Sequence, residues 1–190
     1  SKTELLKFFS HLPSADLIYS INGSTSKSRV FDIVLKMKKP LFIQWAGTDV
    51  LSALQDKQTD NLFLGYADYA SNFCEAPWLI EELQSVGIIA KEQLFSCITS
   101  PKSNSSFTDR FTVFTYIGNN REGFYGLNTF LNLAKLLPEI KFVIVGAEIK
   151  TSLSNVNCLG WVKDMSNVIR NSHVHIRWTF HDSLANTVLE

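Results

Sequence analysis

The sequence has little of the residues that would place the chain in several large protein classes. Its 190 residues include only three cysteines, five prolines and nine glycines. The widely spaced cysteines form no Cys-x-x-Cys pair, so neither a disulfide framework nor a zinc site is indicated. No hydrophobic run approaches the ~18 residues of a membrane span, and no signal peptide opens the chain. We therefore expect a cytoplasmic protein with buried, reduced thiols, and peripheral contact with the inner face of a membrane is compatible with this location.

An excess of charge of one sign is also missing. Eighteen basic and eighteen acidic residues give a formal net charge of zero at neutral pH. No overall field would then draw the chain to nucleic acid or to an anionic membrane. What the chain does have is hydrophobic content, 45% of its residues, including 14 phenylalanines. This is ample for a packed core, and we expect no nucleic-acid partner.

Helical and strand-like patterns alternate along the chain. Helical spacing is predicted over residues 2–11, 28–38, 77–86, 125–137 and 164–171. Apolar runs predict strands over residues 16–21, 41–45, 66–73, 94–98, 111–117, 141–146, 158–162 and 173–179. Such alternation favours parallel sheets covered by helices. With right-handed crossovers, it predicts an α/β protein of two doubly wound, Rossmann-like units.

A polar, serine-rich stretch at residues 100–109 interrupts this pattern. Such a composition is typical of a linker. We therefore expect a first domain over residues 1–99 and a second over residues 110–190. The alternative is a long surface loop within one domain. The final helical segment has no Gly, Asn or Pro to end it, so we expect both domains to be incomplete and the chain to be a fragment.

In doubly wound sheets, ligands bind at the carboxyl ends of the strands. Residues 118–126, GNNREGFYG, follow one such strand. Their glycines let the backbone approach a ligand, and the forked donors of Arg121 could hold a diphosphate. The string is neither a GxGxxG nor a Walker A motif, so it specifies no dinucleotide or nucleoside triphosphate. The alternative is an exposed turn with a solvated arginine.

A second strand ends at residues 44–49, QWAGTD. Gly47 permits a tight turn there, and Asp49 could accept hydrogen bonds from hydroxyl groups. Trp45 could stack on a ring of the ligand. Alternatively, Asp49 caps the segment that follows and Trp45 fills the core.

The last strand leads into residues 181–190, HDSLANTVLE, which we expect to open a helix. The backbone N–H groups and the dipole at the start of a helix can hold an anion such as a diphosphate. Asp182 and Glu190 could accept hydrogen bonds from sugar hydroxyls at either end. Alternatively, Asp182 only caps the start of the helix. His173 and His175 share one strand face, but no third metal ligand is evident, so we interpret them as core or edge residues and expect no metal.

Three segments together resemble a known family. IQWAGTDV (residues 43–50), APWLIEELQSVGI (76–88) and HDSLANTVLE (181–190) resemble, in this order, GT-B glycosyltransferases. The nearest group is the family-four-like retaining enzymes, whose E-x7-E motif has the spacing of Asp182 and Glu190. The resemblance implies transfer of a sugar, with retention, from a nucleoside diphosphate sugar. The acceptor would be a carbohydrate, a lipid-linked group or a protein, and no cofactor or metal would be needed.

The resemblance also implies roles for individual residues. It implies a place beside the transferred sugar for Asp182 and a bond from Glu190 to the donor ribose. The donor-binding set that it implies is Glu190, Arg121, Leu184, Ala185, Asn186 and Thr187. From their positions at the strand ends, we add Arg177 and Gly118 to the donor-binding residues and His181 as a candidate base. On the acceptor side it implies Gly47 and Asp49.

The sequence departs from the family pattern at two positions of this site. Asp182 is one methylene shorter than the family's glutamate, and Tyr125 precedes Gly126 where the family usually has a lysine. A nucleotide-sugar-binding subunit without catalysis is therefore one alternative. A sugar epimerase of the same fold is another. The missing GxGxxG counts against a nicotinamide-binding protein.

Overall fold

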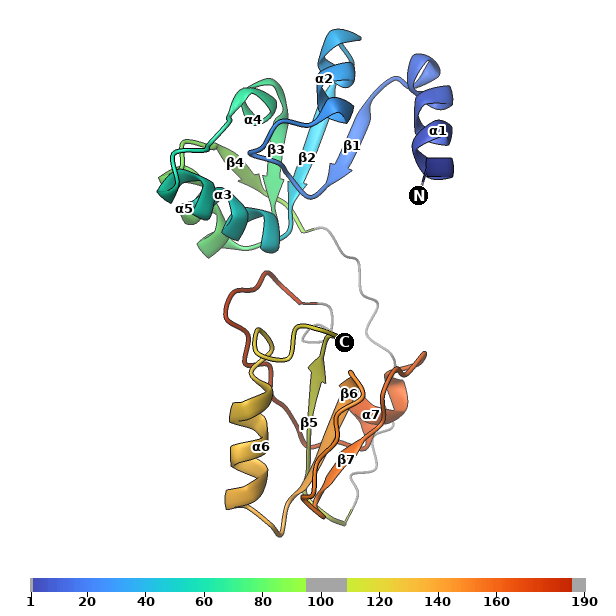
Figure 1. Cartoon of the computed structure of the whole chain (residues 1–190), viewed down its shortest axis with the longest axis vertical. Helices are drawn as coiled ribbons and strands as arrows, with labels where there is room; N and C mark the ends of the chain where they lie inside the picture. Colours follow the sequence, from blue (N-terminus) through green and yellow to red (C-terminus); the bar gives the residue numbers. More distant parts are fainter. Residues whose placement is uncertain (1, 95–108, 186–190) are drawn as a thin grey trace. The chain divides into compact units, whose positions relative to one another are not determined.

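The computed structural model describes residues 2–94 and 109–185 of an α/β protein (Figure 1). The chain divides into two units, Ser1–Cys97 (unit 1) and Ile98–Glu190 (unit 2), each with its own parallel sheet. Of the predicted linker, residues 100–108 lie outside the described residues. Among the described helices, none is long and apolar enough to cross a membrane.

Unit 1 has a four-stranded parallel sheet in which the strands follow one another in chain order. The strands are β1 (Ile18–Ile21), β2 (Leu41–Trp45), β3 (Ser71–Cys74) and β4 (Ala90–Glu92). The helices are α1 (Lys2–His11), α2 (Arg29–Lys36), α3 (Thr48–Gln58), α4 (Gly65–Tyr69) and α5 (Pro77–Ser85), with a 3-10 turn at Leu12–Ser14. When each right-handed crossover steps in the same direction, all connecting helices lie on one face of the sheet.

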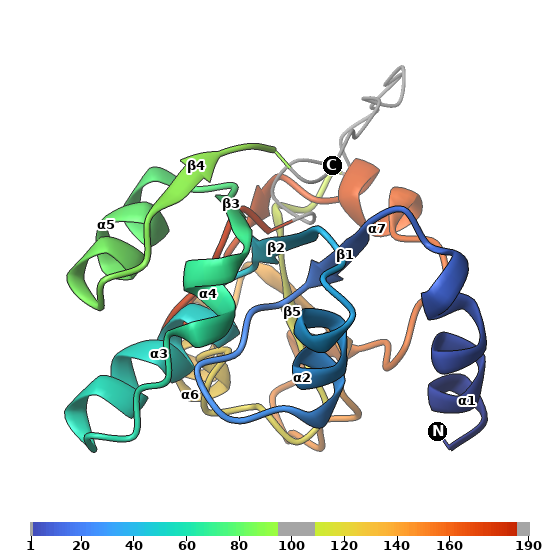
Figure 2. The ribbon, with the colours of Figure 1, turned by 90° about the horizontal axis from the view of Figure 1, so that it is seen from above.

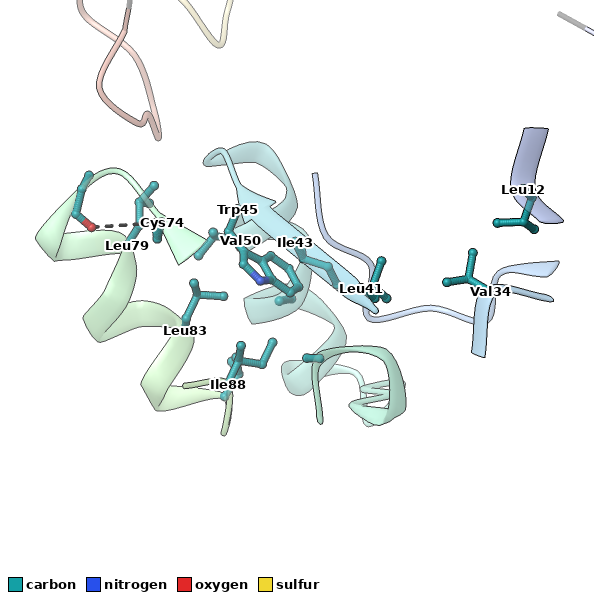
Figure 3. Packing of buried hydrophobic residues seen from close by; sticks show 14 residues of the cluster. Leu12, Val34, Leu41, Ile43, Trp45, Val50, Cys74, Leu79, Leu83 and Ile88 are labelled. Atoms are coloured by element: carbon teal, nitrogen blue, oxygen red, sulfur yellow. Dashed lines mark hydrogen bonds between the residues drawn. The ribbon is translucent and has the colours of Figure 1, made fainter. Parts of the chain in front are cut away.

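Figure 2 shows the helices α2, α3, α4 and α5 on one side of these strands. The core of unit 1 lies on that face (Figure 3). Ile43 and Trp45 of β2 pack there with Leu79 and Leu83 of α5, and all four side chains are fully buried. On the opposite face of the sheet, Tyr19 and Ile21 of β1 are 43% and 54% exposed. The described strands of unit 1 are therefore wound in one direction, where the sequence predicted a double winding.

Unit 2 has the strand order β7-β6-β5-β8. Its strands are β5 (Thr112–Ile117), β6 (Lys141–Gly146), β7 (Val156–Cys158) and β8 (Val174–His175), all parallel. Its helices are α6 (Leu127–Leu136) and α7 (Ser166–Arg170). The order steps from β5 to β7 in one direction and then returns to the other side of β5. This reversal is the mark of a doubly wound sheet.

The reversal buries both faces of the unit 2 sheet. On one face, Val113 and Ile117 of β5 pack with Phe130 of α6. On the other face, Phe114 of β5 packs against a cluster that includes Val168 of α7. Because successive residues of a strand point to opposite faces, burial of both faces leaves no alternation of exposed residues. Phe142–Val145 of β6 are a continuous apolar run, and in β5 even Thr112 and Thr115 are buried.

Several element predictions were wrong in detail. Residues 66–73 were predicted as one strand, but they lie in helix α4 and strand β3. The apolar residues Tyr66 and Ala67 are buried as part of the helix α4. The helix α3 was not predicted, since Val50 and Ala53 are its only buried apolar residues. Strand β4 lies before residues 94–98, of which 95–98 are outside the described residues. The last predicted strand, 173–179, is paired only at Val174–His175.

Candidate functional site

The strand order of unit 2 marks one place for a ligand. Strand β5 leads to β6 on one side, and the chain returns to β8 on the other side. In open parallel sheets, ligands bind at the carboxyl ends of the strands where the order reverses. Here these ends are followed by residues 118–126 after β5 and residues 176–182 after β8, which we call the switch-point loops.

Glycines shape the first of these loops. Gly126 has a φ of 67°, and a Cβ atom on it would lie 2.5 Å from the carbonyl oxygen of Trp178 in the second loop. A Cβ atom on Gly118 would lie 2.9 Å from Cε2 of the Tyr125 ring. Only glycine allows both close approaches. The glycines thus admit other parts of the protein, and the close approach of a ligand to Gly118 stays a prediction.

The two switch-point loops are joined around Tyr125. The backbone N–H of Phe180 donates to the carbonyl of Phe124 at 3.0 Å. The Tyr125 ring makes edge contacts with Phe124 and Tyr116, with centroids 5.4 and 5.9 Å apart. The guanidinium carbon of Arg177 lies 5.4 Å from the centroid of the Tyr125 ring. Tyr125, which the sequence marked only as a departure from a family pattern, is thus the centre of the contact.

Asp182 lies beside the same arginine. One carboxylate oxygen, Oδ2, accepts hydrogen bonds from Nε of Arg177 and, at 3.3 Å, from Oγ1 of Thr179. The other, Oδ1, accepts from the backbone N–H of Ser183 at 3.0 Å. The side chains of Arg177 and Asp182 are only 16% and 29% exposed. The structure therefore brings together two of the predicted site residues as an ion pair.

The other predicted residues of unit 2 are less engaged. Arg121 is exposed, and its guanidinium carbon lies 4.8 Å from the centroid of the Phe124 ring. His181 is half-buried next to Asp182. Leu184 and Ala185 are half-buried and not helical, so the described residues do not include the start of the predicted helix. Three predicted donor-binding residues lie outside the described residues: Asn186, Thr187 and Glu190.

In unit 1, Asp49 connects two loops at the strand ends. Its Oδ2 atom accepts from the N–H of Gly23, in the loop after β1, at 2.6 Å. Its Oδ1 atom accepts from the N–H groups of Ala46 and Val50, each at 3.0 Å. Gly47, with a φ of 109°, precedes α3 in a conformation that favours glycine. Asp49 is buried and bonded to backbone, which fits a structural role better than contact with acceptor hydroxyls.

Trp45 fills the core, so the alternative of stacking on a ligand ring was wrong. The side chain is fully buried (Figure 3). Its Nε1 atom donates to Oδ1 of Asn72 at 3.1 Å. Gly23 lies against the ring, where a Cβ atom would come within 2.4 Å. The lack of a side chain at Gly23 therefore lets the loop after β1 close over the indole, while Asp49 holds it there.

The two histidines of the last strand serve packing. Nδ1 of His173 accepts from the N–H of Thr112 at 3.1 Å, and its ring stacks on Phe111. The ring of His175 stacks on Phe114, with centroids 4.4 Å apart. In the part of the chain that the structure describes, no group of three His, Cys, Asp or Glu side chains could hold a metal ion.

No protein-family model matches the sequence, and no curated protein matches it significantly. The functional interpretation therefore draws on the geometry of the switch-point loops and on the sequence resemblance.

Proposed function

We propose that the chain belongs to a retaining glycosyltransferase of the GT-B type that uses a nucleoside diphosphate sugar as donor. The observation that carries this proposal is the meeting of Tyr125, Arg177 and Asp182 where the strand order of unit 2 reverses. Ligands of doubly wound sheets bind at such a place. Cationic, aromatic and acidic groups gathered there suit an anionic, sugar-bearing ligand.

Sugar transfer from such a donor is faster when positive charge lies beside the leaving diphosphate. In sugar transfer from such a donor, negative charge grows on the leaving phosphate oxygens in the transition state. A guanidinium fixed in advance stabilises that charge, because no reorganisation is needed at the moment of reaction. Arg177 is the better-held group in this site, and Arg121 is a second cation on the neighbouring loop. In this proposal no metal ion is required.

The remaining roles follow from the resemblance and are part of the same proposal. Glu190 would bind the donor ribose, and the N–H groups of residues 184–187 would bind the diphosphate or the sugar. His181 is the candidate base. Unit 1 would serve the acceptor, with Gly47 and Asp49 shaping its loops rather than touching the substrate. The proposed domains are residues 1–99 and 110–190, and the proposed location is the cytoplasm.

A second candidate function is a nucleotide-sugar-binding subunit without catalysis. The ion pair between Arg177 and Asp182 favours it, because the carboxylate expected beside the transferred sugar is engaged by protein donors on both oxygens. Binding of donor without turnover would distinguish this subunit from an enzyme.

A binding and turnover experiment on the 190-residue chain tests both candidates. Its melting temperature is measured with a panel of uridine, guanosine, adenosine and thymidine diphosphate sugars. Nucleotide sugars with one of these bases are expected to bind and so to raise the melting temperature. Glu190→Ala should weaken the binding of that nucleotide sugar at least about tenfold, because a charged hydrogen bond contributes about 1.5–3 kcal/mol. Transfer or hydrolysis of the bound donor supports the enzyme, and binding alone supports the subunit. If no nucleotide sugar binds, both proposals fail.

A further inference from the structure

The contacts around Arg177 fix the orientation of its guanidinium group. Asp182 accepts a hydrogen bond from Nε, on the side of the group nearest the backbone. The Tyr125 ring lies against the group, 5.4 Å from its central carbon. Thr179 donates to the same carboxylate oxygen at 3.3 Å and so holds the carboxylate in place. A planar group held by one end and against a ring retains little rotational freedom.

The far edge of the same guanidinium has no protein acceptor among the described residues. Its two terminal nitrogens carry most of the N–H donors of the group. Within residues 2–94 and 109–185, no protein group accepts a hydrogen bond from them. The edge is planar and always charged, which matches the spacing of two oxygens of a phosphate group.

We infer that Tyr125 and Asp182 are positioning residues that hold Arg177 as a receptor for a phosphate group. The inference rests on the proposed function for the identity of that group, the diphosphate of the donor. It gives Asp182 a different role from contact with the transferred sugar. Asp182 is the counter-ion that orients Arg177, and Tyr125 supplies the surface against which the guanidinium lies.

This role predicts the sign of one substitution. The carboxylate of Asp182 orients Arg177, but its negative charge also repels an anion bound at the far edge. In Asp182→Asn, the amide oxygen can still accept from Nε, while the charge is gone. Pyrophosphate should therefore bind about threefold to tenfold more tightly, with a larger gain at low salt. If Asp182 instead contacted the sugar, the same substitution would weaken nucleotide-sugar binding and leave pyrophosphate unaffected.

The experiment is a titration of the 190-residue chain with inorganic pyrophosphate, followed by calorimetry and by the phosphorus NMR shift. Tyr125→Leu should weaken binding about threefold to tenfold, the range for a cation–π contact, whereas Tyr125→Phe keeps the ring and should bind within about twofold of wild type. Arg177→Lys loses the planar fork and should weaken binding more than about tenfold. Arg170→Lys, an exposed arginine of α7, is the matched control and should change nothing. Melting temperatures of all variants check folding.

The outcomes separate this inference from the proposed function. Three results overturn the inference: wild type does not bind pyrophosphate, Asp182→Asn binds it no more tightly than wild type, or Tyr125→Leu and Tyr125→Phe bind it equally. Nucleotide-sugar binding that does not depend on Arg177 also overturns it and leaves the proposed function standing. The expected pyrophosphate pattern with no nucleotide sugar bound supports the receptor and removes the proposed function.

Discussion

Unit 1 and unit 2 each contain four parallel strands, but the order of the strands differs, and the difference has physical consequences. In unit 1 the order β1-β2-β3-β4 puts the described helices in one core, and the opposite face keeps exposed side chains such as Tyr19 and Ile21. In unit 2 the reversal at β5 buries both faces. Strand order therefore decides how much of a parallel sheet is covered, even when strand number and direction are the same.

The loops at the strand ends differ as well. In unit 1 a buried carboxylate, that of Asp49, binds backbone N–H groups of two loops and closes them over Trp45. In unit 2 an aromatic ring and an ion pair join the loops and leave one edge of Arg177 without a protein acceptor among the described residues. In the first arrangement the polar groups are bonded to the protein, whereas in the second the terminal nitrogens of Arg177 have no protein acceptor among the described residues. This is why we place the ligand at unit 2.

The largest expected effect compares a tryptophan from each unit. Trp45→Ala should lower the free energy of unfolding by about 3–5 kcal/mol, because it leaves a cavity in the core of unit 1. It also removes the donor that Asn72 accepts from. Trp161→Ala, at a side chain 76% exposed in unit 2, should change stability by less than about 0.5 kcal/mol. Urea unfolding followed by circular dichroism measures both. Equal losses would contradict the assignment of Trp45 to the core.

The next effect compares the two aspartates. Asp49→Asn should lower the free energy of unfolding by about 1.5–3 kcal/mol, because charged hydrogen bonds to buried N–H groups are weakened. Asp182→Asn should lower it by at most about 1 kcal/mol, since the ion pair of Asp182 is partly exposed. The exposed Asp60→Asn, at a φ of 59° that asparagine tolerates, is the control with no expected loss. A large loss for Asp182→Asn would mean that its carboxylate mainly stabilises the fold.

A smaller effect tests how closely the strands of unit 2 approach. Gly146, at the end of β6, has a φ of 102°, and a Cβ atom there would lie 2.3 Å from the carbonyl oxygen of Ile117. Gly146→Ala should therefore destabilise the protein by about 1–3 kcal/mol through backbone strain, or by more with the clash. Gly123→Ala, where a Cβ atom meets nothing within 4 Å, is the control. If both variants melt alike, the strand end is less constrained than described.

The smallest effect concerns one thiol from each unit. Burial raises the pKa of Cys74 and of Cys158, so at a given pH below the pKa less reactive thiolate is present. In a Cys97→Ser background, both should react with a disulfide reagent at pH 7.5 more slowly than in urea, because unfolding removes the burial that raises their pKa. Cys158 is only half-buried and should react before fully buried Cys74. The reverse order would contradict the burial of β3.

Much of the local structure followed from the sequence. The bounds of α1, β2 and β6 were predicted residue for residue. Pro13 and Pro40 lie close to such bounds, because proline interrupts regular hydrogen bonding. The helix α3 escaped prediction because its apolar residues are sparse, and α4 was predicted as a strand because a short apolar run fits either element.

The candidate site was predictable only in part. Arg121, Arg177 and Asp182 could be assigned to strand ends, since each follows an apolar run. The contact of Tyr125 with Arg177 was not predictable, because it joins two loops that are distant in the chain. The sequence offered the burial of Trp45 as an alternative, and the structure confirms it. The bond of Asp49 to Gly23 was not predictable, because it joins two loops that are distant in the chain.

The sequence by itself determined the alternation of helices and strands, because periodicity and turn residues act over a few neighbouring positions. Only the tertiary structure decided that β8 pairs with β5 rather than with β7. Such pairing is set by hydrogen bonds and packing between segments that are far apart in the chain, which local patterns do not encode. That one pairing creates the reversal of strand order and, with it, the place where Tyr125, Arg177 and Asp182 meet.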